Sequence, residues 1–362
     1  MGENLYVSYG QNGLEMVKEL LRAIDAAKRI PPGSRIGLKP NLAVARPAQE
    51  GATTAPELVE GVIQYLQGHG LKDLVILEGS WIGASTRQAF QLCGYADLAR
   101  GYGVDLVDLQ KDGAHTCSVE ALDLRICDTM NDIDYLINFP VLKGHCQTKM
   151  TCALKNLKGC IPNEEKRRFH SLGLHRPIAY LNKAVRSDLI VVDGLMGDLD
   201  FEEGGNPVQM DRIIVGTDPV LVDSYVAHLM GWEPGDIPYI GLAERIGVGR
   251  VFGPSSEVVV LNAQHTTARI KPTRQVQELA RYIEENQACS ACYGSLIHAL
   301  GRLQERGLLH RAPRGIVIGQ GFQGQGGRGF GVGRCTGGFD SYIKGCPPTA
   351  KAILDFLQDH LE

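Results

Sequence analysis

The sequence lacks the long apolar run that a membrane-spanning helix needs, since no stretch approaches 18 consecutive apolar residues. It also lacks a basic N-terminal stretch followed by an apolar core, so we expect no secretory signal. Tyr6 stands where a myristoylation signal requires serine or threonine, which argues against lipidation. These absences predict a cytoplasmic protein without a membrane partner.

Neither sign of charge dominates the chain, because 37 lysines and arginines face 41 aspartates and glutamates. A general nucleic-acid binder is usually strongly basic, so no nucleic-acid partner is expected. The ten cysteines are more typical of free thiols or metal ligands than of disulfides in a reducing cytoplasm. A homodimer is the default expectation for assembly.

Short segments rich in valine, isoleucine and leucine alternate with helical patterns over the first 265 residues. The segments predicted as strands are 35–39, 74–78, 104–109, 122–126, 135–139, 189–193, 212–216 and 258–261. The segments predicted as helices are 13–28, 56–69, 85–100, 176–186, 219–230 and 238–246. Continuous apolar strands are typical of a sheet covered on both faces. The pattern therefore predicts an α/β fold with a mainly parallel sheet and helices on both faces.

The C-terminal part has a different pattern. Predicted helices at 273–286, 293–306 and 347–361 surround a short strand at 315–319 and a glycine-rich loop at 319–338. With 362 residues the chain is long enough for two domains. We predict an α/β domain over residues 1–268 and a small α/β module over residues 269–362.

Four cysteines in the last 75 residues form the most informative motif. Cys289 and Cys292 make a C-x2-C pair, and Cys335 and Cys346 follow as C-x10-C. Four thiolates can hold a 4Fe-4S cluster or a zinc ion. Zinc sites usually present two tight pairs, so the long second spacing and the glycine-rich loop favour one 4Fe-4S cluster. Zinc binding and free thiols remain the alternatives.

Basic residues gather between positions 143 and 176, where Glu164 and Glu165 are the only acids. Part of this basic segment reads as a helix from about 148 to 158, with lysines interleaved among apolar residues. Buried lysines need anionic partners, so the segment predicts a pocket for a carboxylate or phosphate. A solvated basic surface is the alternative interpretation. Its cysteines, Cys146, Cys152 and Cys160, are interpreted as small core residues rather than ligands of a second cluster.

Polar residues follow several predicted strands at the point where each strand ends. Lys39 and Asn41 follow the first, and Glu78, Asp193 and Asp218 follow others. The carboxyl edge of an α/β sheet is where such folds bind ligands. The alternative is that these residues serve only as strand exits and turns.

A resemblance to a known family extends over roughly residues 35–265. It is carried by LKPNL (38–42), NFPVLKGHCQTKMTCALKNLKGCIP (138–162), His170, IVVDGLMG (190–197) and VGTDPVLVDSY (215–225). These strings resemble the domain-of-unknown-function family 362, and K-x-H…T-x-x-L-K-N-x-x-G is the specific part. The resemblance implies an association with iron–sulfur motifs and anaerobic metabolism. This chain lacks the ferredoxin-like C-x2-C-x2-C-x3-C-P run, and its Gly-Cys-Pro-Pro ending is similar to cluster-binding subunits of hydrogenases.

These observations predict an oxidoreductase that passes electrons from one 4Fe-4S cluster to a small anionic substrate, with a redox partner protein. The predicted catalytic residues are His145, His170 and Lys143, the two histidines as proton donors or else as core residues. The predicted substrate-binding residues are Lys39, Asn41, Lys149, Lys155, Asn156, Asp193 and Asp218. An electron-transfer or cluster-carrier protein without substrate chemistry is one alternative. A non-redox lyase or isomerase that uses the cluster as a Lewis acid is another.

Overall fold

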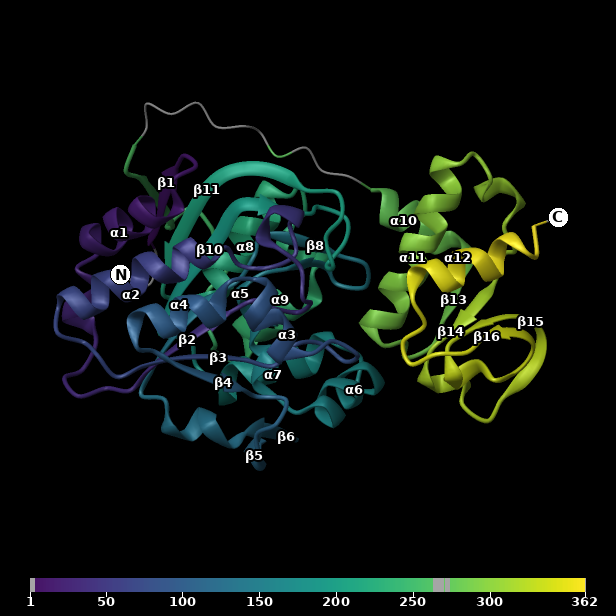
Figure 1. The fold of residues 1–362 in the computed structure, drawn as a ribbon, viewed down its shortest axis with the longest axis horizontal. Coiled ribbons are helices and arrows are strands. Elements are labelled where there is room, and N and C mark those ends of the chain that lie inside the picture. Colours follow the sequence, from purple (N-terminus) through teal and green to yellow (C-terminus); the bar gives the residue numbers. More distant parts are fainter. Residues whose placement is uncertain (1–3, 263–269, 271–273, 362) are drawn as a thin grey trace.

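The computed structural model describes residues 4–262, 270 and 274–361, and its two main sheets lie in separate parts of the molecule (Figure 1). The larger sheet has eight strands in the order β12-β1-β11-β10-β7-β2-β3-β4. In chain order they are β1 (Asn4–Tyr9), β2 (Ile36–Pro40), β3 (Leu74–Glu78), β4 (Asp105–Asp108), β7 (Tyr135–Phe139), β10 (Leu189–Gly197), β11 (Val208–Gly216) and β12 (Glu257–Val260). Only β11 runs antiparallel to its neighbours in this sheet. The prediction of an α/β fold with a mainly parallel sheet is confirmed.

Helices cover both faces of the large sheet. One face carries α1 (Gly13–Ala23), α2 (Pro56–Gly68), α3 (Thr86–Leu92) and α4 (Tyr95–Tyr102), and the other carries α5 (Ala153–Asn156), α7 (His175–Ala184), α8 (Pro219–Leu229) and α9 (Pro238–Arg245). Successive strand residues point to opposite faces. Leu189 therefore packs into the first layer and Ile190 into the second.

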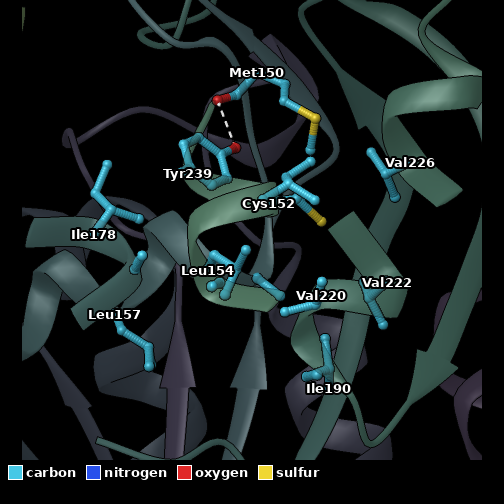
Figure 2. Packing of buried hydrophobic residues seen from close by; sticks show 14 of the residues in the cluster. Met150, Cys152, Leu154, Leu157, Ile178, Ile190, Val220, Val222, Val226 and Tyr239 are labelled. Atoms are coloured by element: carbon cyan, nitrogen blue, oxygen red, sulfur yellow. Dashed lines mark hydrogen bonds between the residues drawn. The ribbon is translucent and has the colours of Figure 1, made fainter. Parts of the chain in front are cut away.

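The second layer contains the middle of the basic segment (Figure 2). Met150, Cys152 and Leu154 are fully buried there against α8 and α9, and the Tyr239 hydroxyl donates to the Met150 carbonyl at 3.3 Å. Cys160 is fully buried in the same cluster. Two short antiparallel hairpins accompany the sheet, β5 (Ala114–Val119) with β6 (Leu122–Cys127) and β8 (Lys143–His145) with β9 (Lys149–Thr151).

The smaller sheet is wholly parallel, with the order β13-β14-β15-β16. Its strands are β13 (Ile283–Glu285), β14 (Ile316–Ile318), β15 (Gly326–Val332) and β16 (Gly338–Ile343). Helices α10 (Gln275–Leu279), α11 (Ser290–Glu305) and α12 (Ala350–Gln358) share a core with it, and Phe201 from the loop after β10 joins that core. The domain boundary predicted at residues 268–269 lies outside the described residues.

Several predicted elements differ from the structure. Residues 149–151 form β9 rather than the start of a helix, residues 283–285 form β13, and the predicted loop 319–338 contains β15. Parallel neighbours on both sides supply the backbone hydrogen bonds of β15, which offsets the low strand propensity of its glycines. The predicted helix 85–100 is divided at Gly94, which has a φ of +81°.

The remaining helical elements are short. Helix α6 (Asn163–Ser171) lies beside the basic segment and was not predicted. Turns of 3-10 helix are η1 (Ala26–Arg29), η2 (Ala48–Glu50), η3 (Asp128–Asp132), η4 (Leu157–Cys160), η5 (Pro234–Asp236), η6 (Ala280–Tyr282), η7 (Leu309–Arg311), η8 (Gln320–Phe322) and η9 (Arg334–Thr336). No helix within the described ranges has the length and apolar character needed to traverse a bilayer.

Candidate functional site

The topology of the small sheet brings the four C-terminal cysteines to one edge. Cys289 follows β13 and caps α11, and Cys292 lies in the first turn of that helix. Cys335 follows β15 within η9, and Cys346 follows β16. Because the strands are all parallel, their carboxyl ends meet at the same edge. Gly333 has a φ of +91°, and a side chain there would meet the Cys292 Sγ atom at 3.8 Å.

The pKa values of these thiols reflect their proximity to one another. Burial, followed by the charges of Cys346 and Cys335, raises the pKa of Cys289 to about 11. Burial and the charges of the other three cysteines also raise the pKa of Cys292. Four thiolates without a counterion repel one another, so they would be stabilised by a bound metal centre. An all-thiol donor set of this kind fits an iron–sulfur cluster.

No three histidine, cysteine, aspartate or glutamate side chains in the described part of the chain are gathered closely enough to enclose a single metal ion. Each thiolate of a 4Fe-4S cluster binds a different iron atom. All ten cysteines are free thiols in the structure.

A cavity lies at the carboxyl edge of the large sheet, beside the first turn of α11; we call it the main pocket. In the large sheet, β2 lies between β3, to which the chain runs next, and β7, which comes later in the chain. The strand order therefore switches direction between β2 and β7, and α/β sheets bind ligands at such a switch. The pocket is lined by Asn41, Ala43, Glu78, Gly79, Trp81, Ile82, Thr151, Lys155, Asn156, Lys158, Gly159, Lys166, His170, Glu202, Cys289, Ser290 and Ala291. Cys289 thus belongs to the cysteine group and to the pocket wall at once.

An amide network fixes one wall of the main pocket. Asn41 Nδ2 donates to Asn156 Oδ1 at 2.8 Å, and Asn156 Nδ2 donates to Asn138 Oδ1 on β7 at 2.7 Å. Lys143 Nζ donates to Asn41 Oδ1 at 3.0 Å and to the carbonyl oxygens of Ala52 and Glu202. Lys143 does not line the pocket, and these contacts make it a support for the Asn41 side chain.

Two buried carboxylates neutralise two of the predicted lysines. Glu78 Oε2 lies 2.9 Å from Lys39 Nζ and also accepts from the Leu42 amide. Glu202 Oε1 lies 2.5 Å from Lys155 Nζ. Burial favours the protonated carboxyl of Glu202, but its interactions with His145 and Lys155 outweigh burial and hold its pKa well below the usual range.

The two predicted histidines differ in their surroundings. His145 Nδ1 accepts from the backbone amides of Gln147 and Thr148, and its Nε2 lies 2.9 Å from Glu202. Burial lowers the pKa of His145 to about 4. His170 lines the main pocket, and its Nε2 accepts from the Ser290 amide at 3.4 Å. Burial, and then the charge of Lys158, lowers the pKa of His170 well below 6.5.

Four predicted binding residues do not line the main pocket, and one of them is Lys39, the buried partner of Glu78. Lys149 is partly exposed, 3.3 Å from Asp236 and over the Trp232 ring. Asp218 caps α8 by accepting from the amides of residues 220 and 221. Asp193 accepts from the amides of Ala55 and Leu195, and burial raises its pKa to about 6.

Sequence reasoning missed several residues of the pocket. Lys158 and Lys166 line it, together with Trp81 and Glu202. Lys158 stands three residues after Lys155, and that spacing was a signal that both face one side. Glu202 lies in an irregular loop between β10 and β11, where no periodic pattern places it. Lys166 Nζ donates to the carbonyls of Gly79 and Ser80, and burial lowers its pKa to about 8.

Gln147 connects the basic segment to the cysteine region. Its Nε2 donates to the Ala288 carbonyl at 3.0 Å, and its Oε1 accepts from the Ser290 hydroxyl at 2.8 Å. A second connection joins Glu203 to His298 of α11 at 3.1 Å, with the Phe201 ring stacked on His298. The main pocket is therefore walled by residues from both parts of the molecule.

The fold and the site define an α/β protein with a polar cavity at the carboxyl edge of its sheet. Comparison with known proteins gives the family: the chain belongs to the family described as Domain of unknown function (DUF362), whose model matches residues 36–228. The matched residues include the amide network and the pocket lysines but not the four C-terminal cysteines.

Two further likenesses accompany the family match. The chain is 31% identical over 231 residues to the thylakoid-associated protein sll1697 of Synechocystis sp. (strain ATCC 27184 / PCC 6803 / Kazusa), covering 60% of this chain and 70% of that protein. It is also similar to the lactate racemase apoprotein of Thermoanaerobacterium thermosaccharolyticum, with a TM-score of 0.42 and 12% identity. That match covers 62% of this chain and 57% of the racemase chain.

Proposed function

We propose that the protein is an oxidoreductase in which Cys289, Cys292, Cys335 and Cys346 hold one 4Fe-4S cluster beside a pocket for a small anionic substrate. The observation that carries this proposal is the double position of Cys289, which lies within the cysteine group and in the wall of the main pocket. When bound, the cluster would supply single electrons.

The chain's own residues would orient the substrate and deliver a proton. Asn41 and Asn156 hold fixed amide groups at the pocket wall. His170 Nε2 accepts from Ser290, so the neutral ring carries its proton on Nδ1. That buried Nδ1–H has no hydrogen-bond partner among the described residues, so the neutral ring could donate a hydrogen bond to the substrate, and it would deliver a proton only from its doubly protonated form. Lys39, Lys143 and Lys155 would position this wall through their protein partners.

We propose that the protein works in a reducing cytoplasm, because the thiols would have to remain unoxidised to bind iron. A redox partner protein would deliver electrons from the side of Cys346, which is the exposed member of the group. Assembly as a homodimer is part of the same proposal and is tested by sedimentation. No membrane or nucleic acid takes part.

Anaerobic purification with a count of iron and sulfide tests the cluster. We expect about four iron atoms per chain and an EPR signal after reduction with dithionite. Serine at any one of the four cysteines should remove most of this iron. Cys117→Ser, on the β5–β6 hairpin, is the matched control and should keep it. One equivalent of zinc with a silent spectrum would contradict the proposal.

A second candidate, electron transfer or cluster carriage without substrate chemistry, is favoured by the exposure of Cys346. An exposed cluster can be passed to an acceptor protein. Incubation with an iron-free ferredoxin separates the two functions. Rapid loss of iron to that acceptor would support the carrier, and retention would argue against cluster carriage.

A further inference from the structure

The main pocket contains one lysine whose ammonium has no direct partner in the described part of the chain. Lys158 lies on η4, half-buried, and its ammonium has no hydrogen bond or ion pair within the described residues. The other lysines differ: Lys39 and Lys155 pair with carboxylates, and Lys166 donates to two carbonyls. An unpaired, partly desolvated ammonium is unfavourable in the folded protein, and it is the group that an anionic ligand would stabilise.

The first turn of α11 reaches the same pocket. Cys289 is its N-cap, and Ser290 and Ala291 line the cavity. The first amide groups of a helix have no acceptor inside it and carry partial positive charge. Ser290 donates to His170, a side chain that is only 6% exposed and whose Nδ1 has no partner in the part of the chain described. A helix of 16 residues, a buried donor and a free ammonium thus border one cavity.

We propose that Lys158 and the first turn of α11 bind the negative end of a small monoanion, such as a carboxylate, next to Cys289. This inference takes its substrate site from the proposed oxidoreductase function and narrows the class of ligand. It assigns the anion to a residue that sequence reasoning did not select, because the lysines selected there are paired within the protein or lie outside the pocket.

The charge balance of the pocket favours a monoanion over a dianion. Three lysines and two carboxylates line it, which leaves an excess of one positive charge when Lys158 is protonated. Burial, and then the charge of Lys155, lowers the pKa of Lys158 to about 7, so a bound anion would favour its charged form. The carboxylates are Glu78 and Glu202, so a second ligand charge would lie near fixed negative groups in a medium of low dielectric.

Lys158→Met is expected to lose anion affinity without losing stability. Methionine has a similar length and no charge, so the variant removes the ligand's partner without leaving a buried protein charge unpaired. We expect acetate to bind about tenfold more weakly or worse, because a charged hydrogen bond is lost. The thermal midpoint of the ligand-free protein should be equal or higher, which a purely structural lysine would not give.

Titration calorimetry with acetate and sulfate on the full, anaerobically purified chain tests both the role of Lys158 and the preference for a monoanion. The unaltered protein should bind acetate at least about tenfold more tightly than sulfate, and this comparison needs no variant. Lys158→Arg should retain part of the acetate affinity. Lys183→Met is the control, because Lys183 contacts the Ile246 carbonyl far from the pocket. Unchanged acetate binding by Lys158→Met, or tighter binding of sulfate than acetate, would overturn the inference.

Iron and sulfide are counted on the same samples, so the two proposals can fail separately. A full cluster with acetate affinity indifferent to Lys158 rejects the anion site alone. Acetate binding that depends on Lys158 in a chain without iron rejects the oxidoreductase and leaves the anion site in place.

Discussion

The buried lysines of this protein differ in what neutralises them. Lys39 and Lys155 each pair with a carboxylate, and Lys143 donates to an amide oxygen and two carbonyls. Removing one member of a buried ion pair leaves an uncompensated charge, which typically costs about 3–5 kcal/mol. These three lysines are therefore held in place by protein groups, whereas Lys158 has no such partner among the described residues.

His145 is expected to make the folded protein less stable as the pH falls. Burial, then the charge of Lys155, lowers its pKa to about 4, against the opposing influence of Glu202. An unfolded histidine takes up its proton near pH 6.5. Between pH 6.5 and 4 the unfolded chain thus binds more protons at this residue, so the free energy of unfolding falls as the pH falls. The gap between the two pKa values corresponds to about 3 kcal/mol.

The comparison variant is His145→Asn, whose side-chain oxygen can accept from the amides of Gln147 and Thr148 as Nδ1 does. Urea denaturation at pH 7, 6, 5 and 4.5 measures both proteins. We expect the stability advantage of histidine to shrink steadily below pH 6.5. An advantage that is constant over this range would show that His145 titrates normally in the folded protein.

At the level of elements, the parallel order of the small sheet is what brings the distant cysteines together. Three of its strands end within four residues of a cysteine: β13, β15 and β16. The loops after β13 and β14 cross closely, because the amide of Gly321 donates to the Asn286 carbonyl at 3.0 Å. The arrangement of the cysteines at this edge of the small sheet thus depends on how tightly these loops pack.

Gly319, which follows β14, allows this close packing. Its φ is +131°, and a side chain there would overlap the Asn286 backbone carbonyl. We expect Gly319→Ala to destabilise the C-terminal segment by about 3 kcal/mol, from backbone strain and overlap together. Gly324 is the matched control, with a φ of +79° and nothing within 4 Å, and its alanine variant should cost about 1 kcal/mol. Denaturant unfolding, together with the amide exchange of β14, measures the loss of stability in both variants. Equal losses in the two variants would contradict the role of Gly319 in the close packing of these loops.

At the scale of the whole molecule, the two parts meet at the main pocket and through Phe201, which joins the core of the small sheet. Beside Phe201, the connecting contacts are polar: Gln147 bonds Ala288 and Ser290, and Glu203 lies beside His298. Polar interfaces of this kind are easily loosened. The position of Cys289 relative to the pocket lysines thus depends on a few hydrogen bonds.

Gln147→Ala tests this dependence, because it removes two bonds to the start of α11. We expect amide exchange over residues 288–292 to become at least about tenfold faster, while β2 and β7 keep their protection. Gln88→Ala, on the exposed side of α3, is the control. Exchange at 288–292 that does not change would mean that the helix start is held by other contacts.

The sequence by itself determined the class of fold, because apolar strands alternating with amphipathic helices have few ways to bury their surfaces. It also marked the four cysteines and the basic segment, since residue type and spacing are visible without folding. It did not place β15, whose glycines carry no strand preference, nor Glu202, which lies in an irregular loop. Only the tertiary structure decided which lysines are paired and that Cys289 borders the pocket. The lysine pairs join residues 39 and 47 positions apart, and the contact that brings the start of α11 to the pocket joins residues 120 positions apart, so no local pattern encodes them.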